Sequence, residues 1–459
     1  MVNRLVIAAP ASGSGKTTVA TGLMAALRRS GNRVAPFKVG PDYIDPGYHS
    51  LATGRPGRNL DPVLVGESTI APLFVHGSRG CDIAVVEGVM GLFDGRVDTM
   101  GIGSTAHVAK LINAPVLFVV DARGQSRSLA ALLHGFRGYD PTVRLGGVIL
   151  NQVGSERHEQ VLRDACLEVG LDVLGVLPRD PEFVLPSRHL GLVTAAEHGP
   201  EAVAAVDAIA AAVAKHVDLD AVRALAASVP AMAVPAWDPG VSSVANGPLI
   251  AVAGGAAFTF GYAEHVEILR AAGASVVTVD PLRDSALPAG TAGLVLPGGF
   301  PEQHAEELSA NSALRTAVAE FARSGGPVHA ECGGLLYLAR SLDGRPMCGV
   351  LDADGSMTPR LTLGYRDAVA SEDSALYPAG SRVTGHEFHR TALSTPHGER
   401  PAWRWRGTDH KPVAEGFVVG GVHASYLHTH PAGDPLAVER FVHACHPFVE
   451  PTAGGTVFA

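Results

Sequence analysis

The chain has 459 residues, roughly three times the ~150-residue length of a typical domain, so the sequence predicts two or three domains. With 46% hydrophobic and 18% charged residues, its composition is that of a globular protein and argues against extensive disorder. The formal net charge of -9 argues against nucleic acid as the main partner.

From Arg4 to about Pro178, short apolar runs alternate with segments of helical periodicity. This repeated βα pattern predicts a doubly wound α/β domain built on a parallel sheet. A long Ala-rich helix over 201–227 is expected to end the domain. The expected strands are 5–9, 34–39, 83–86, 116–120, 148–150 and 173–177.

Residues 228–247 are dense in Pro, Ala, Ser and Gly and are predicted to be an interdomain linker. A second α/β pattern follows, and beyond Met347 it changes to alternating strand-like runs. The predicted division is a first domain over 1–227, the linker over 228–247, a second domain over 248–447 and a tail over 448–459. In the second domain we expect strands at 249–253, 276–279, 293–296 and 327–330, and helices at 262–272, 302–323 and 436–445.

The five cysteines are scattered and include no CxxC pair, so neither a disulfide framework nor a zinc cluster is indicated. A reducing cytoplasm fits this pattern best. The uncharged stretch over 239–263 is interrupted by Asn246, Pro248 and the Gly254–Gly255 pair. Its apolar part is only about ten residues long, half a membrane span, so we expect a buried strand and no membrane association.

The segment from Ala9 to Thr18 follows the first predicted strand and opens the first helix, which is the context of a phosphate-binding loop. Glycines let backbone N–H groups converge on phosphate oxygens, the lysine neutralises phosphate charge, and the Thr17 hydroxyl suits Mg²⁺. Pro10 stands where the usual pattern has Gly, and a ligand-free Gly/Ser-rich turn is the alternative. The candidate ATP-binding residues are Gly13, Ser14, Gly15, Lys16, Thr17 and Thr18.

Two further strand ends carry polar side chains. Glu87 ends a buried strand, at the edge where an open α/β sheet presents ligands, and its carboxylate is a candidate Mg²⁺ ligand. Lys38, Asp42 and Asp45 follow another strand. For the two aspartates, ordinary turn chemistry beside Pro and Gly is the alternative interpretation.

Cys332 lies between a predicted strand and a predicted helix in the segment Glu-Cys-Gly-Gly, which is the arrangement of a nucleophile elbow. At a helix N-terminus the dipole is expected to favour its thiolate. Gly333, together with Gly299 from another strand-end glycine pair, is expected to supply backbone N–H groups to an oxyanion. A buried structural cysteine is the alternative.

The nucleophile needs a base, and a nearby run offers His423, His428 and His430. A histidine such as His423 is more often a satisfied core residue than a catalytic one.

The segments FKVGPDYIDPGYHS and VVEGVMGLFDG, with the variant phosphate loop, resemble the amidoligase half of the cobyrinic or hydrogenobyrinic acid a,c-diamide synthases, relatives of dethiobiotin synthetase. The resemblance implies ATP with Mg²⁺ and activation of a substrate carboxylate as an acyl phosphate. It implies Mg²⁺ at Thr17, Asp45 and Glu87, ATP contacts from Lys38 and Asn151, and substrate contacts from Asp42, Asp45 and Asp94. For Asn151, a strand-end turn is the alternative to an adenine contact.

The C-terminal segments resemble a class I glutamine amidotransferase of the cobyrinic and cobyric acid synthase type, in which Tyr-Leu-His carries the catalytic histidine, here His428. Many class I glutaminases have Glu two residues later, where this chain has His430. His430, a backbone carbonyl or Glu331 therefore remain alternatives for orienting His428, and His430 is itself an alternative base.

Together the two resemblances cover nearly the whole chain. They imply glutamine- and ATP-dependent amidation of the a and c acetates of a corrinoid acid, with ammonia from the Cys–His site. The alternatives are cobyric acid synthase-type amidation of other side chains, or a regulatory or partitioning ATPase carrying a non-catalytic glutaminase-like module. A corrinoid acid is the expected partner, with neither nucleic acid nor a membrane, and a homodimer is left open.

Overall fold

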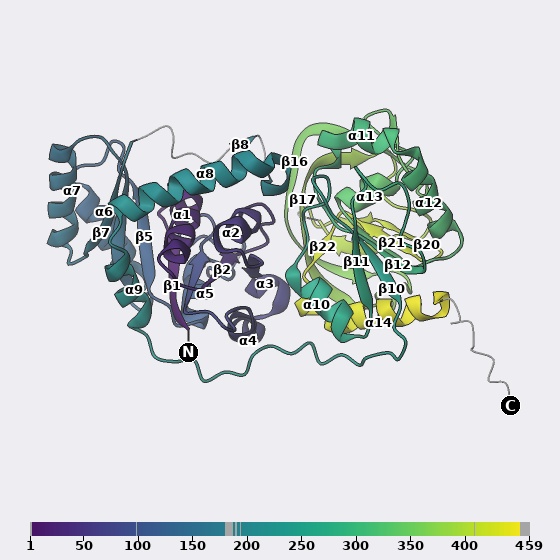
Figure 1. Cartoon of the computed structure of the whole chain (residues 1–459), viewed down its shortest axis with the longest axis horizontal. Helices are drawn as coiled ribbons and strands as arrows, with labels where there is room; N and C mark the ends of the chain where they lie inside the picture. Colours follow the sequence, from purple (N-terminus) through teal and green to yellow (C-terminus); the bar gives the residue numbers. More distant parts are fainter. Residues whose placement is uncertain are drawn as a thin grey trace. The chain divides into compact units, whose positions relative to one another are not determined.

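The computed structural model describes residues 2–449 apart from 98, 180–186, 189–190, 193 and 408. The chain forms two compact units, Met1–Trp237 and Asp238–Ala459 (Figure 1). Their boundary falls within the segment 228–247. Beyond Val449, the expected tail lies outside the described residues.

The first unit is a parallel sheet in the order β3-β2-β4-β1-β5-β6-β7. Strands β1, β2, β4 and β5 are almost wholly buried, which accounts for their unbroken apolar runs. The doubly wound fold and the six expected strands are confirmed. The strands are β1 Asn3–Ala8, β2 Val34–Val39, β3 Arg58–Leu60, β4 Ile83–Glu87, β5 Val116–Asp121, β6 Leu145–Val153 and β7 Val173–Pro178, with a separate pair β8 Ser187–Arg188 and β9 Gly191–Leu192.

Helices α1–α7 connect successive strands of the sheet, α8 and α9 follow its last strand, and α1 packs beside α8 (Figure 1). They are α1 Lys16–Arg29, α2 Asp45–Thr53, α3 Pro62–Val65, α4 Glu67–Gly77, α5 Thr105–Leu111, α6 Leu129–Tyr139, α7 Glu156–Glu168, α8 Ala195–His216 and α9 Leu219–Ala227. The expectation of one helix over 201–227 is wrong. Val217 is extended and bridges Gly175, and the Asp218 carboxylate then caps α9 by accepting from the N–H groups of Asp220 and Ala221.

The second unit contains a sheet in the order β11-β10-β12-β13-β21-β20, parallel except for β20. A further sheet follows the order β15-β14-β16-β17-β22. In addition, β18 pairs with β16, and β19 pairs with β18. The strands are β10 Leu249–Ala253, β11 Ser275–Val279, β12 Thr291–Leu296, β13 Val328–Glu331, β14 Ser341–Leu342, β15 Arg345–Pro346, β16 Asp354–Ala370, β17 Arg382–Leu393, β18 Trp403–Arg406, β19 Pro412–Glu415, β20 Phe417–Val419, β21 Val422–Ser425 and β22 His428–Thr429.

Helices α10 and α14 contact each other, while α11, α12 and α13 contribute to the main apolar core of this unit (Figure 1). The expected single helix over 302–323 is wrong, because Asn311 interrupts it and its side chain caps α12 through the N–H of Leu314. The helices are α10 Ala263–Ala271, η1 Pro301–His304, α11 Ala305–Ala310, α12 Ser312–Arg323, α13 Gly333–Leu338, η2 Pro431–Gly433, α14 Pro435–Cys445 and η3 His446–Phe448.

All five cysteines are free, as their spacing predicted, and all five are buried. In the described part of the chain, none of the helices combines the length and the apolar character that crossing a bilayer requires.

Candidate active sites

The predicted phosphate loop joins β1 to α1. Gly15, the residue before α1, has φ 92°, and a Cβ at this position would collide with the side-chain amide of Asn151. Lys16 is buried, and its Nζ donates to the carbonyl oxygens of Ala11 (3.1 Å) and Met90 (2.5 Å). The Lys16 ammonium group is therefore held by backbone carbonyl oxygens at the N-terminus of α1. The N-terminus of a helix is a favourable place for a phosphate.

The strand-end residues predicted around this loop come together in one buried cluster. The Thr17 hydroxyl donates to Glu87 Oε1 at 2.6 Å and lies 3.3 Å from Asp45 Oδ2. Lys38 Nζ donates to Asp45 Oδ2 (2.6 Å), Glu87 Oε1 (3.0 Å) and the carbonyl oxygen of Gly88 (3.1 Å). Residues from β2, β4, α1 and α2 thus meet at the carboxyl edge of the sheet, because neighbouring parallel strands end there.

Charge pairing sets the protonation of this cluster. Burial alone would lower the pKa of Lys38, but the carboxylates of Asp45, Glu87 and Asp42 outweigh it and raise that pKa. Burial would likewise raise the pKa of Glu87, yet Lys38, followed by His49, holds it well below its ordinary value. Burial, reinforced by the charge of Lys38, lowers the pKa of Lys16 to about 8.

His49 belongs to this cluster and was missed by the sequence analysis. It is fully buried, and its Nε2 lies 2.7 Å from Glu87 Oε2. The available signal was its spacing, since His49 follows Asp45 by four residues and the two share one face of α2.

The donor set suits a magnesium ion. Across the described ranges, no group of three or more His, Cys, Asp or Glu side chains is arranged to hold a metal. Magnesium, however, is usually held by one or two carboxylates together with substrate phosphates and water. Asp45, Glu87 and the Thr17 hydroxyl provide such oxygen ligands, and Lys38 places a positive charge directly between the two carboxylates.

Three other predicted residues make local contacts in this unit. Asp42 Oδ1 accepts from the N–H groups of Ile44 and Asp45, and Asp42 Oδ2 lies 4.0 Å from Lys38 Nζ. The Asp94 carboxylate accepts from the N–H of Gly91. Turn chemistry is thus present at both aspartates, and their contact with substrate stays a prediction.

The third residue, Asn151, donates from Nδ2 to the carbonyl oxygen of Ser14 at 3.1 Å. Its side chain thereby contacts the phosphate loop itself. An adenine contact from this position stays a prediction.

Cys332 lies at a sharp bend between β13 and α13. Its φ is 48°, unusual for a residue other than glycine, and its backbone N–H donates to the carbonyl oxygen of Ser425 at 2.7 Å. The strand–bend–helix arrangement matches the nucleophile elbow predicted from sequence. The expectation of a favoured thiolate is wrong for the free protein: Cys332 is 3% exposed, and burial raises the pKa of its thiol despite a hydrogen bond from the Gly333 N–H.

The glycine pair Gly298–Gly299 lies beside both halves of the predicted catalytic pair. A Cβ on Gly298 would come 2.5 Å from His428 Cε1, and a Cβ on Gly333 would come 2.9 Å from the Gly299 nitrogen. Only glycine permits these approaches. The loop therefore borders the imidazole of His428 on one side and the start of α13, next to Cys332, on the other.

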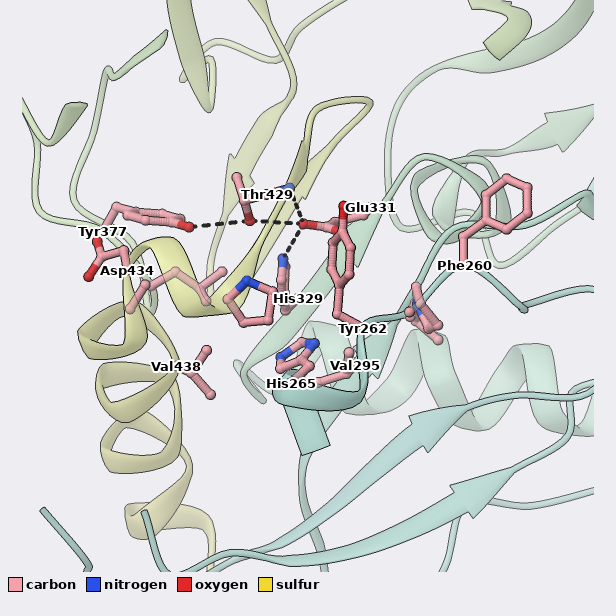
Figure 2. A pocket seen from close by; sticks show the side chains of 16 residues that line it. Phe260, Tyr262, His265, Val295, His329, Glu331, Tyr377, Thr429, Asp434 and Val438 are labelled. Atoms are coloured by element: carbon pink, nitrogen blue, oxygen red, sulfur yellow. Dashed lines mark hydrogen bonds and ion pairs between the residues drawn. The ribbon is translucent and has the colours of Figure 1, made fainter. Parts of the chain in front are cut away.

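Glu331 places its carboxylate beside the imidazole of His428. Glu331 Oε2 lies 3.6 Å from His428 Nδ1, while Oε1 accepts from the backbone N–H and the hydroxyl of Thr429, each at 3.1 Å. Figure 2 shows Glu331 between Thr429 and His329. Burial would raise the pKa of Glu331, but hydrogen bonds from His329 and His428 hold it well below its ordinary value. An ionised carboxylate therefore lies beside the imidazole.

The other two histidines of the run have different surroundings. His430 Nδ1 accepts from the N–H of Ala432 at 3.2 Å, and its ring packs against Tyr262. His423 is buried against Trp403 and Tyr377, and burial lowers its pKa to about 3. His423 therefore lies in the core, as expected, but the expectation that it is satisfied there is wrong, because neither ring nitrogen has a hydrogen-bond partner among the described residues.

Comparison with known families covers both units. Residues 5–193 match the model of a CobQ/CobB/MinD/ParA nucleotide binding domain, and residues 249–435 match that of a CobB/CobQ-like glutamine amidotransferase domain.

Full-length relatives give the same result. The hydrogenobyrinate a,c-diamide synthase of Mycobacterium bovis is 62% identical, with 96% of this chain and 97% of the relative covered. The protein of the same name from Streptomyces coelicolor is 59% identical, with 97% and 98% covered. A cobyrinate a,c-diamide synthase of Synechococcus is 41% identical, with 96% and 98% covered. The chain therefore belongs to the a,c-diamide synthase family, as an amidating ligase that joins a nucleotide-binding domain to a glutamine amidotransferase domain.

Proposed function

We propose that this ligase converts hydrogenobyrinic acid to its a,c-diamide, with glutamine as the nitrogen donor and ATP as the activating substrate. The observation that carries the proposal is the buried cluster of Thr17, Lys38, Asp45 and Glu87 beside a phosphate-binding loop. This cluster combines the ammonium group of Lys38 with oxygen ligands at the place where a nucleoside triphosphate would meet a carboxylate substrate. The full-length relatives carrying the name of this activity support it over a regulatory ATPase.

In this proposal the ligase domain comprises residues 1–227, followed by a linker over 228–247 and a glutaminase domain over 248–447. The phosphate loop holds the ATP phosphates through its backbone N–H groups and Lys16, and Asn151 contacts the adenine. Thr17, Asp45 and Glu87 would hold Mg²⁺, which neutralises phosphate charge when bound. The loop residues assigned to ATP are Gly13, Ser14, Gly15, Lys16, Thr17 and Thr18.

The proposed ligase reaction has two steps. A substrate acetate attacks the γ-phosphorus of ATP, which forms an acyl phosphate and releases ADP. Ammonia then attacks the acyl carbon and phosphate leaves, which yields the amide. Lys38 moves from the carboxylates toward the transferring phosphoryl group in this scheme. Its buried ammonium donates to the same Glu87 oxygen as the Thr17 hydroxyl, so it is well placed to balance the phosphoryl charge. Asp42, Asp45 and Asp94 border the substrate.

For the glutaminase reaction we propose Cys332 as nucleophile, His428 as base and Glu331 as the residue that orients His428. The Cys332 thiol transfers its proton to the imidazole as its sulfur attacks the glutamine side-chain amide, and ammonia leaves from the resulting intermediate. Water then hydrolyses the thioester. The N–H groups of Gly299 and Gly333 stabilise the oxyanion in both stages. The 3.6 Å approach of Glu331 to His428 favours Glu331 over His430, whose Nδ1 accepts from Ala432.

The choice of a cobalt-free corrinoid rests on the relatives. Hydrogenobyrinate a,c-diamide synthases are 53–62% identical to this chain, and the cobyrinate a,c-diamide synthases compared with it are 41–43% identical. Cobyrinic acid is accordingly the second candidate substrate.

Labelled oxygen tests the proposal. Hydrogenobyrinic acid carrying ¹⁸O in its carboxylates is incubated with ATP, Mg²⁺ and ammonium, and the released phosphate is analysed by mass spectrometry. An acyl phosphate transfers one ¹⁸O to phosphate for each amide formed. Unlabelled phosphate would contradict the acyl phosphate, and the absence of amidation would contradict the assigned substrate. Unlabelled cobyrinic acid in a parallel reaction measures the preference between the two corrinoids.

A further inference from the structure

Glu331 contacts imidazoles on two sides. His329 Nε2 lies 3.4 Å from Oε1 of this carboxylate, and His428 Nδ1 lies 3.6 Å from Oε2. His329 precedes Glu331 by two residues on β13, so both side chains emerge on the same face of the sheet. Figure 2 shows the His329 imidazole directed at the carboxylate, with His265 below it in the view.

We propose that His329 is a positioning residue of the glutaminase site: it donates from Nε2 to Glu331 and so holds that carboxylate against His428. The inference rests on the proposed roles of Cys332, His428 and Glu331. His329 itself touches neither glutamine nor the nucleophile in this scheme.

His329 is buried, and the contact of its Nε2 with Glu331 is its polar interaction among the described residues. The residue is 7% exposed, and its Nδ1 has no hydrogen-bond partner among the residues that the structure describes. Burying an imidazole costs free energy unless a polar contact compensates for it. Glu331 is the group that provides this contact, so an apolar side chain would fill the same space more favourably if packing were the sole requirement.

The neighbouring histidines do not compete for Glu331. The ring of His265 lies 5.5 Å from that of His329, and the ring of His423 lies 6.2 Å away on β21, directly opposite in register. Burial lowers the pKa of His265 to about 4 and that of His423 to about 3, so both are neutral near pH 7. The contacts of the Glu331 carboxylate are therefore with Thr429, His329 and His428, and neither His265 nor His423 brings a positive charge to it.

A cavity of about 20 Å³ beside this group makes substitution practicable. His329, Glu331, His265 and Tyr377 are among the residues that line it, as Figure 2 shows. A glutamine at position 329 can place its amide N–H near the position of the imidazole Nε2, whereas a leucine fills similar volume without a donor.

The experiment compares His329→Leu with His329→Gln, and uses His423→Leu as the matched control. The control removes an equally buried imidazole of the same sheet that makes no recorded hydrogen bond to Glu331 in the described residues. Glutamate release from glutamine gives kcat and KM of the glutaminase, and ammonia-dependent amidation with thermal unfolding reports on folding of each variant.

We expect His329→Leu to lower the glutaminase kcat by about 10- to 100-fold, the loss of one hydrogen bond to a charged group. KM for glutamine should stay within about twofold, and ammonia-dependent amidation should be unchanged. His329→Gln should recover most of kcat, and His423→Leu should retain it.

Three results would overturn the proposal: wild-type kcat in His329→Leu, equal losses in the Leu and Gln variants, or the same loss in His423→Leu. Glutamate release requires no corrinoid amidation. Failure of the wild-type enzyme to amidate hydrogenobyrinic acid would therefore contradict the proposed substrate and leave the test of His329 intact.

Discussion

The two sites handle charge in opposite ways. In the nucleotide-binding unit, Lys38 and Glu87 are already ionised and paired in a buried cluster with Asp45, whose own pKa is raised by burial and by the nearby charge of Asp42. In the amidotransferase unit, burial raises the pKa of the Cys332 thiol, and Glu331 supplies a negative charge one residue away. In the proposed mechanism, the first site is prepared for substrates that bring charge with them, and the second creates its charge during the reaction.

This difference has a physical reason. ATP and carboxylates carry several negative charges, so a site for them requires fixed positive groups whose desolvation is compensated before the substrate arrives. Glutamine presents a neutral side-chain amide, so a neutral thiol beside a base suffices until attack begins. A substitution that inactivates one of the two sites should therefore leave the reaction at the other site intact.

The largest difference between the glutaminase and amidation activities is expected from Cys332→Ala. Without its sulfur nucleophile the glutaminase should lose at least about 10³-fold in kcat, while amidation from added ammonium should continue. Glutamate release and corrinoid amidation are measured in parallel. Cys81→Ala, another buried thiol, is the control and should retain both activities. A glutaminase kcat in Cys332→Ala close to that of the wild type would contradict its role as nucleophile.

Lys16→Ala is expected to have the opposite effect, with amidation lost and glutaminase activity retained. Removal of this ammonium should lower amidation by about 10²- to 10³-fold with either glutamine or ammonium, because it leaves phosphate charge without a partner. Basal glutamate release should persist. Lys110→Ala, which breaks a half-exposed ion pair with Asp140 in the same unit, should leave amidation unaltered. Normal turnover of Lys16→Ala would remove the ATP-site assignment.

Two buried glutamates of the second unit offer an intermediate test. Burial raises the pKa of Glu415 to about 8, so it is protonated near pH 7, whereas Glu331 is ionised. Glu331→Gln should thus lower glutaminase kcat by about 10- to 100-fold, since it removes a charge beside His428. Glu415→Gln replaces a neutral acid with a neutral amide and should change kcat little. Equal effects in steady-state assays at pH 7 would refute the assigned ionisation states.

The smallest effect concerns the pH dependence of ATP binding. With the pKa of Lys16 near 8 in the free enzyme, ATP must bind together with a proton above that pH, because its phosphates favour the ammonium form. KM for ATP should therefore rise between pH 8 and 9 by up to about tenfold, while KM for glutamine does not follow it. Lys16→Arg keeps its charge throughout this range and should show no inflection near pH 8. A flat wild-type profile would contradict the prediction.

Much of both sites was accessible from local sequence. The phosphate loop and the elbow around Cys332 each lie between a strand and a helix, with Gly15 at the bend of the first, and with Cys332 at the bend of the second and Gly333 opening its helix. Such motifs are readable because a few consecutive residues determine their backbone geometry. His49 and His329 were missed because each acts through a carboxylate, at Glu87 and Glu331, and their sequence spacing alone is common in buried helices and strands.

By itself, the sequence determined the two α/β units, the order of their strands along the chain, the phosphate loop and the nucleophile elbow, since hydrophobic periodicity and glycine placement are local properties. Only the tertiary structure decided the breaks at Asp218 and Asn311, the meeting of Lys38 with Asp45 and Glu87, and the neutral state of Cys332. It also placed the Glu331 carboxylate 3.6 Å from the Nδ1 of His428. Burial and the pairing of charges depend on residues far apart in the chain, and those distances exist once the sheets have formed.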